Sequence, residues 1–366
     1  MKHFIALAVV VLVLAGCTSR SGHPGRPTAP TQVTVVNSAR GKPIPKVDVA
    51  GKQLDAHEGS IVYTDGTYWM IGNTYGCGYE WIHKATPWCG FRTYSSPDMV
   101  HWTNRGATFD ANDAYWQKLC SGLGCFDARL IHDPTGPWRM WFNAYNARSG
   151  YAVMSAPSPA GPWTRNSTPN LAVGNNHPGR GNGAGGLFLD RDGKGYIAYT
   201  AWTMQGYDVI EQLDPHLLTG TGRHAIIKAP SAEAPSLFRQ PGGTYTVTYD
   251  DPGCAWCGGV ATSYATAPSP MGPWTLRGQL TARSCDGQAS AQVAVLPGVI
   301  LWVSDQWTNL LKPRPAKWNG MTDIQAVGHW NQTNATQHWE PLEFTGPDGR
   351  IRPIRCEATI TVPLAQ

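Results

Sequence analysis

Charged side chains are scarce in this sequence. Lys, Arg, Asp and Glu make up only 15% of the 366 residues, and the formal net charge is a weak +4. Because the basic residues are not clustered, a large basic face is excluded and we expect no nucleic-acid partner. The 42% of hydrophobic residues nevertheless indicates a folded globular protein rather than a disordered chain.

The sequence also lacks an amphipathic helical segment of useful length. No group of His, Cys, Asp and Glu has the spacing of a metal site, and no organic cofactor is implied. Glycine and tryptophan, in contrast, are abundant, with 41 and 16 copies. This combination is typical of short strands, tight turns and surfaces that face sugars.

A short apolar run stands at the N-terminus, in MKHFIALAVVVLVLAGC. It is too short for a comfortable transmembrane span and resembles a signal peptide, and its end, Leu14 to Cys17, is similar to a bacterial lipobox. The resemblance implies cleavage before Cys17 and a lipid on its sulfur. We therefore expect an exported protein that is lipid-anchored to the bacterial cell membrane and faces outward. An ordinary signal peptide or a membrane anchor is the alternative.

The segment that follows, residues 18–48, is rich in Pro, Ser and Gly and predicts a flexible tether. Eight further cysteines come after Cys17, and an even number in an exported chain favours disulfides. The expected pairs are Cys77 with Cys89, Cys120 with Cys125, Cys254 with Cys257, and Cys285 with Cys356. For the Cys254-Ala-Trp-Cys257 motif, a redox or zinc site is the alternative.

Residues 49–366 repeat one unit five times. The second strand of each unit is predicted from an aromatic or apolar alternation, and Asp and Gly residues that accept a positive φ precede most of these strands. The five segments are GTYWMIG from Gly66, PWRMWFN from Pro137, GKGYIAYT from Gly193, GTYTVTY from Gly243 and GVILWVSD from Gly298.

The outer half of the unit repeats as well. A Ser-Pro turn followed by Trp-Thr occurs in TYSSPDMVHWTNRG, YAVMSAPSPAGPWTRNS and SYATAPSPMGPWTLRG. Five four-stranded units predict an all-β, five-bladed β-propeller, which we expect to be monomeric. A β-sandwich is the alternative fold, although its strands would not recur with one outer-hairpin signature.

In a propeller the innermost strands all begin near one mouth of the central channel, so the residues at their heads converge. The predicted heads are Glu58, Asp127, Ala184, Glu233 and Gln288. A slip of one residue would turn any of these side chains to the other face.

Two carboxyl groups across a gap the size of a sugar ring are what cleavage of a glycosidic bond requires, one as an acid and one as a base or nucleophile. Glu233 lies among Ala232, Ala234 and Pro235, so low polarity is expected to raise its pKa, as suits a general acid. Glu58 has the more polar neighbour His57 and suits a general base. An exposed or capping carboxylate is the alternative for each.

With these motifs the chain resembles glycoside hydrolase family 43, whose members are five-bladed propellers that act on arabinans, xylans or galactans. Glu58 in HEGSIVYTDGTYW takes the place of the family's first acid, and Glu233 in EAPSLF that of its general acid. The segments AHEGSIV and YSSPDMVHWTNRG are most similar to the branch with exo-β-1,3-galactanases. In that branch a Gln on the fifth inner strand is thought to hold the water, and Gln288 matches it.

The chain departs from the family at the third inner strand. There the family has an Asp that tunes the general acid, whereas this chain has Ala184. Asp127, one blade earlier, is the nearby replacement that we propose as a modulator. The departure leaves open slow or altered chemistry, or a propeller that binds sugar without catalysis.

Several polar and aromatic residues are expected to shape the pocket: His57, Asn143, Trp202, Asp305 and Trp307. Each Trp could stack on a sugar ring or belong to the core. His57 could bond a sugar hydroxyl or orient Glu58, and Asp305 could face the pocket or belong to a turn.

These features predict an inverting glycosidase that acts on a galactose- or arabinose-containing glycan. Glu233 would be the acid, Glu58 the base, and Gln288 would position water or substrate. A non-catalytic carbohydrate-binding lipoprotein is the second hypothesis, and a surface propeller that binds another protein is the third.

Overall fold

The computed structural model describes residues 31–79, 86–120, 122, 124–177, 181–229, 231–251, 260–287, 292–306, 332, 334–346 and 348–365. Cys17, Cys254, Cys257, Gln288 and Trp307 lie outside these residues, so the predictions about them stay predictions. In the described part of the chain, no helix is both long and apolar enough to cross a bilayer.

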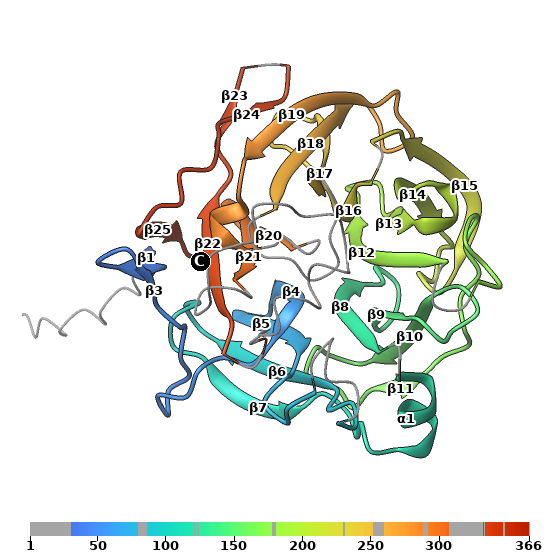
Figure 1. Cartoon of the computed structure of the whole chain (residues 1–366), viewed down its shortest axis with the longest axis horizontal. Helices are drawn as coiled ribbons and strands as arrows, with labels where there is room; N and C mark the ends of the chain where they lie inside the picture. The colour runs from blue at the N-terminus through green and yellow to red at the C-terminus, as the bar shows by residue number, and fades with distance from the viewer. Residues whose placement is uncertain are drawn as a thin grey trace, which may run out of the picture. The chain divides into compact units, whose positions relative to one another are not determined.

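The described residues of the compact unit form five antiparallel sheets around a central axis, as Figure 1 shows. This arrangement confirms the predicted five-bladed propeller. The blades are β4 (His57–Thr64), β5 (Thr67–Asn73), β6 (Phe91–Ser96) and β7 (Thr103–Ala107); β8 (Cys125–His132), β9 (Trp138–Ala144), β10 (Tyr151–Ala156) and β11 (Thr164–Arg165); β12 (Asn182–Leu189), β13 (Gly195–Ala201), β14 (Tyr207–Leu213) and β15 (Gly220–Ile227); β16 (Glu233–Arg239), β17 (Tyr245–Asp251), β18 (Ala261–Ala267) and β19 (Thr275–Thr281); and β20 (Val293–Leu296), β21 (Val299–Gln306) and β22 (Thr336–Pro341).

The predicted second strands are β5, β9, β13, β17 and β21, and each pairs with the innermost strand of its blade. Their turns have the expected chemistry. In blade 1, Asp65 and Gly66 have φ of 48° and 74°, and Thr64 pairs with Thr67 across them. Two consecutive residues with positive φ match the right-handed twist of a hairpin, which is why Asp-Gly is suited to this turn.

The hydrophobic core lies between neighbouring blades. One cluster of buried side chains joins blade 1 to blade 2, and similar clusters fill the other four junctions of the described residues. In the first, Phe91 packs edge-on against Phe142, with ring centroids 5.0 Å apart. Aromatic side chains bury a large area each, so the many aromatics of the repeats stabilise the ring at its junctions.

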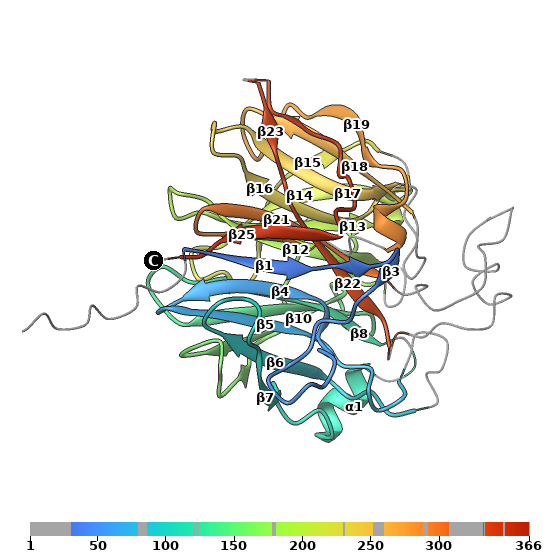
Figure 2. The same ribbon diagram turned by 90° about the vertical axis from the view of Figure 1, so that its left-hand side faces the viewer.

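The two ends of the described chain meet beside blade 5. β1 (Gln32–Val36) pairs with β25 (Thr359–Pro363), and both lie next to β22 in Figure 2. The Asn37 side chain donates to Trp339 O at 2.8 Å and accepts from Trp339 N at 3.0 Å. The compact unit therefore begins at Thr31. The prediction of a tether over residues 18–48 is wrong from Gln32 onward, because this segment pairs with the C-terminal strand.

The remaining elements are short. They are β2 (Ser38–Ala39), β3 (Lys42–Pro43), β23 (Phe344–Thr345), β24 (Arg350–Ile351), α1 (Ala114–Cys120), η1 (Trp202–Met204) and η2 (Ser284–Asp286). Three of the predicted disulfides are confirmed: Cys77–Cys89, Cys120–Cys125 and Cys285–Cys356. The last joins η2, ahead of blade 5, to the segment that leads into β25.

Replacing both Cys285 and Cys356 with Ala is expected to lower the free energy of unfolding by about 2–4 kcal/mol, because this bridge closes a long loop of the unfolded chain. Urea denaturation of the oxidised proteins measures the change. The short-range pair Cys120–Cys125 serves as a comparison, and its double Ala variant should lose less. Equal losses for the two variants would contradict the loop-closure explanation.

Candidate active site

The innermost strands of blades 1 to 4 share a β-bulge close to their first residues. The register shifts by one residue between His57 and Ser60, and the same shift occurs in β8, β12 and β16. A bulge turns the extra residue out of the regular alternation and re-aims its side chain, which is why bulges are frequent beside active sites.

The shared register also shows which head residues correspond. Glu58 and Asp127 take the same place, with left-handed φ of 50° and 57°. Glu233 lies one position earlier, opposite Asp250, while Ala234 takes the left-handed place with φ 54°. The predicted equivalence of the heads is therefore wrong by one residue for Glu233, because the bulge was not visible in the sequence.

Glu58 is buried, and its Oε2 accepts hydrogen bonds from Tyr75 Oη and Asn73 Nδ2, both at 2.9 Å. Burial, followed by the charges of Asp127 and Asp305, raises the pKa of Glu58 well above its usual range, and the Tyr75 bond opposes this rise. Glu58 was expected in a polar, solvated setting. The structure corrects this: polar contacts surround one oxygen, but the carboxyl group is shielded from water.

Asp127 forms a buried ion pair with Arg129, whose Nη2 lies 3.2 Å from Oδ1. Burial raises the pKa of Asp127 to about 7, against the opposing charge of Arg129. The same guanidinium donates to Glu58 O at 2.5 Å, to Gly59 O, and to Gly185 O at 2.9 Å. Arg129 thus joins the heads of β4, β8 and β12, and it supplies a cation beside Asp127.

Glu233 is almost completely buried, and its Oε2 has no hydrogen-bond partner among the described residues. Burial raises the pKa of Glu233 well above its usual range, and the charges of Asp250, Asp127 and Asp208 raise it further. The apolar neighbours of Glu233 predicted this direction. The three additional carboxyl groups were not foreseen.

Asp208 and Asp250 are buried acids that the sequence analysis missed. Asp250 stands on β17 directly across from Glu233, and Asp208 on β14 accepts a 3.1 Å bond from Thr200 Oγ1. Acids directly opposite each other destabilise a sheet when both are ionised. Alternation along TYTVTYDD could have assigned Asp250 to the face of Val247 and Thr248's neighbour Tyr249 only after the bulge was known, so no sequence signal located it.

Glu58, Asp127 and Glu233 converge on one region. The charge of Asp127 raises the pKa of both glutamates, and all three carboxyl groups raise the pKa of the buried Tyr145 phenol in addition to the effect of its burial. The structure therefore brings together acids that are 175 positions apart in the chain at most, from Glu58 to Glu233. Such a group of perturbed carboxyl groups is typical of a catalytic site.

Other predicted pocket residues have structural contacts. Asn143 Nδ2 donates to Gly150 O at 2.7 Å and to Asn182 O at 3.3 Å, which ties blade 2 to blade 3. Trp202 on η1 is only partly buried and lies against Gly183, beside the head of β12. Trp202 therefore remains a candidate for stacking on a sugar, whereas the Asn143 amide is a brace between strands.

His57 and Asp305 contact each other rather than the open part of the site. Nδ1 of His57 lies 3.2 Å from Asp305 Oδ1, and the backbone N of Glu58 donates to Asp305 Oδ2 at 2.8 Å. Asp305 is fully buried. The prediction that Asp305 binds substrate is corrected by these contacts, because both of its oxygens are occupied by the protein.

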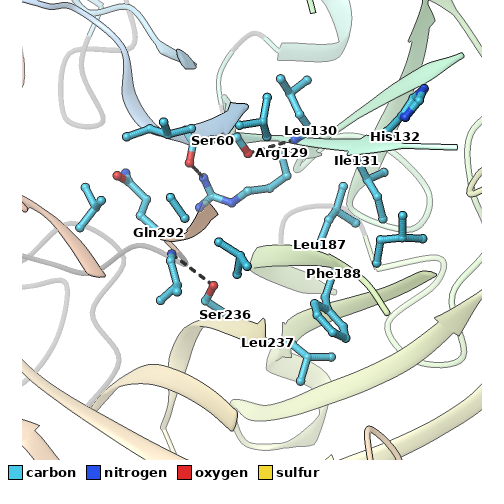
Figure 3. A pocket seen from close by; sticks show the side chains of 18 of the residues that line it. Ser60, Arg129, Leu130, Ile131, His132, Leu187, Phe188, Ser236, Leu237 and Gln292 are labelled. Carbon is cyan, nitrogen blue, oxygen red and sulfur yellow. Dashed lines mark hydrogen bonds between the residues drawn. The ribbon is translucent and has the colours of Figure 1, made fainter. Parts of the chain in front are cut away.

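A cavity of about 260 Å³ lies along the propeller axis, beyond the bulges. Figure 3 shows Ser60, Arg129, Ser236 and Gln292 at its polar part, with Leu and Phe side chains further along. Glu58, Asp127 and Glu233 are not in its lining. Arg129 and Gln292 thus lie between this axial cavity and the acids.

One group of possible metal ligands, Cys285, His338 and Glu340, occurs in the described residues. It does not fit a metal ion, because the sulfur of Cys285 is bonded to Cys356 and cannot act as a thiolate. Glu340 instead accepts bonds from His338 and from the backbone N of Arg355 and of Glu357.

A propeller whose inner strands present buried carboxyl groups at one mouth is the kind of site found in carboxylate-dependent glycosidases. Residues 49–287 match the profile described as "Glycosyl hydrolases family 43", and the chain belongs to that family. A curated relative, the arabinoxylan arabinofuranohydrolase of Bacillus subtilis (strain 168), is 25% identical over 316 residues. The match covers 76% of this chain, which spans 58% of the relative's length.

Solved structures share the fold at lower identity. A family 43 β-1,3-galactosidase with galactodeoxynojirimycin is 20% identical, with a TM-score of 0.68 over 87% of this chain and 97% of its own. The exo-β-1,3-galactanase of Phanerochaete chrysosporium with β-1,3-galactotriose is 18% identical, with a TM-score of 0.68 over 91% and 69% of the two chains. That of Clostridium thermocellum is 20% identical, with a TM-score of 0.65 over 90% and 68%.

The raised pKa of Glu233 makes stability depend on pH. Below the usual glutamate pKa the carboxyl group is protonated in both states. As the pH rises toward the folded-state pKa, the unfolded chain releases its proton first, so stability is lost. Between about pH 5 and about pH 8, the melting temperature of the wild type should therefore fall more than that of Glu233→Gln. Thermal scans measure both slopes.

The exposed Glu343, which pairs with Arg352, provides the control. Glu343→Gln should keep the wild-type slope. Parallel pH dependence in all three proteins would show that the carboxyl group of Glu233 is not kept protonated by the fold.

Proposed function

We propose that the protein hydrolyses glycosidic bonds in a galactose- or arabinose-containing glycan. The observation that carries this proposal is the unpartnered, buried carboxyl oxygen of Glu233, in a site that it shares with Glu58 and Asp127. Membership of family 43 supports hydrolysis, and the names of the similar proteins, a galactosidase, galactanases and an arabinofuranohydrolase, support the sugar class.

Glu233 is the proposed general acid. A carboxyl group that stays protonated near neutral pH can give its proton to the leaving glycosidic oxygen, and Asp250, Asp208 and Asp127 each disfavour its ionised form. Its free Oε2 leaves an oxygen available for the substrate. Loss of that proton to water is discouraged by burial.

Glu58 is the proposed general base, with Asp127 as the modulator. Each raises the proton affinity of the pair, so the site holds fewer negative charges than carboxyl groups near neutral pH. Hydrogen bonds from Tyr75 and Asn73 favour the ionised form of Glu58, which is the form that takes a proton from water. Attack of that water on the far side of the sugar from Glu233 would give inversion, and Gln288 would hold the water or the substrate.

The alternative is a carbohydrate-binding protein without catalysis. The specific observation in its favour is Ala184, which stands where the family's third acid is expected and packs against Ala234. Export and lipid anchoring at Cys17 remain part of either proposal, and we propose that the protein is a monomer.

A panel of galactans and arabinans separates the two functions. Glu233→Ala should lower hydrolysis by about 10²–10⁴-fold, since this is the usual contribution of a positioned acid. Glu343→Ala should retain wild-type rates. Release of reducing sugar measures activity, and calorimetry measures binding. Binding without hydrolysis by the wild type would identify a sugar receptor, and neither binding nor hydrolysis would favour a protein-binding surface.

The Asp250 charge predicts a shift of the pH profile. Asp250→Asn should lower the pKa of Glu233, so that the acid loses its proton at lower pH and the alkaline limb of kcat/KM moves downward. The neighbouring Asp251, which accepts a 2.9 Å bond from Ser263, gives a matched control. If Asp251→Asn shifts the limb as far as Asp250→Asn does, the local charge of Asp250 is not the cause.

A further inference from the structure

Asp305 joins the last blade to the first. It lies near the end of β21 and receives bonds at both oxygens. Oδ1 faces His57 Nδ1 at 3.2 Å and accepts from Gln337 Nε2 at 3.0 Å; Oδ2 accepts from Glu58 N at 2.8 Å and from Gln292 Nε2. Two carboxylate oxygens offer about four acceptor positions, so these donors leave none for a sugar hydroxyl.

The bond to the Glu58 amide acts at a strained point. Glu58 is the bulge residue of β4, and its φ of 50° is unfavourable for a side chain with a Cβ. Such a conformation costs about 1–3 kcal/mol and persists where neighbouring groups fix it. Asp305 fixes the amide of Glu58, and Arg129 bonds to its carbonyl oxygen. The direction of the Glu58 side chain therefore depends on contacts from two other blades.

A second layer of contacts holds Asp305 from outside the ring. Gln337 on β22 donates to Asp305 and also to Ala56 O at 3.0 Å, next to β4. Its backbone oxygen accepts a 2.6 Å bond from Lys46 Nζ, and Lys46 also donates to Asn37 Oδ1 at 3.1 Å. Lys46 and Asn37 precede residue 49, where the family match begins. The segment first expected to be a tether thus contacts the support of the site.

The charged groups around Asp305 come from several elements. Lys46 attracts it from the N-terminal segment and His57 bonds it from β4, while Glu58 and Asp127 lie near enough for mutual repulsion. Arg129, on β8, is attracted by the same carboxylate. The negative charge of Asp305 raises the pKa of both Glu58 and Asp127.

We propose that Asp305 is a positioning residue for the Glu58 carboxyl group, and that Lys46 of the N-terminal segment supports it through Gln337. This inference rests on the proposed function for its kinetic consequences, but the geometry of Asp305 does not depend on that function. Asp305 touches no reacting atom. It acts by fixing the backbone that aims Glu58 and by setting the charge that Glu58 experiences.

The test compares Asp305→Asn with the wild type in the full chain. An amide has donors where the carboxylate only accepts, so bonds to the surrounding N–H groups are lost. We expect kcat to fall about tenfold or more, as is usual when a catalytic group is misplaced, with KM changed less than about threefold. The acid limb of kcat/KM should move to lower pH, since removing the charge lowers the pKa of Glu58 and Asp127.

Two variants control for folding. Asp133 is an equally buried acid that bonds Thr135 and Arg139, far along the strands from the bulges, so Asp133→Asn should lower stability without moving the pH profile. Lys46→Met removes the outer support at a half-exposed position and should lower kcat severalfold with the fold retained. If Asp305→Asn loses stability as Asp133→Asn does but keeps the wild-type kcat and pH profile, Asp305 is only structural. A rise in KM alone would make it a substrate contact.

A titration of ¹³C-labelled glutamate carboxyl groups, with the Glu58 signal assigned through Glu58→Gln, reads the same coupling without any substrate. Asp305→Asn should lower the pKa of Glu58, and an unchanged titration would overturn the inference. Absence of hydrolysis by the wild type would instead reject the proposed function, so the two failures can be told apart.

Discussion

The Arg129 guanidinium holds together the part of the propeller on which the chemistry depends. It bonds to backbone oxygens of β4 and β12 and pairs with Asp127 on its own strand. A buried cation is costly unless its donors are satisfied. Here it offsets part of the repulsion among carboxyl groups that the fold has removed from water. Three blades thus meet at one side chain, and the heads of their inner strands cannot shift independently.

The sequence was sufficient for the fold because the repeats carry it locally. Asp65-Gly66 and its equivalents fix hairpins, and the aromatic residues beside them fill the junctions between blades. Two features escaped prediction. A bulge depends on pairing with another strand, so the position of Glu233 relative to Glu58 was off by one residue. The pairing of β1 with β25 joins segments at opposite ends of the chain, and no local pattern in the Pro-rich stretch indicates it.

The site was predicted where it depends on strand heads and missed where it depends on neighbouring strands. Glu58, Asp127 and Glu233 head inner strands, and the propeller geometry brings them together. Asp250 and Asp208 lie on the second and third strands of their blades, and burial with Glu233 gives them their influence. They also change the meaning of Ala184. Small residues at the head of β12 do not leave Glu233 without acidic neighbours, because carboxyl groups from β14 and β17 surround it instead.

The ribbon of β1 and β25 has a further consequence for how the molecule can be presented. In Figure 2 the C-terminus lies at the end of the blades toward which β4 points, opposite the strand heads that carry the acids. Gln32 pairs with Pro363, so the chain also enters the fold on that far side. Whatever the molecule is fastened to through either chain end therefore approaches from behind, and the mouth stays open to long, branched polymers.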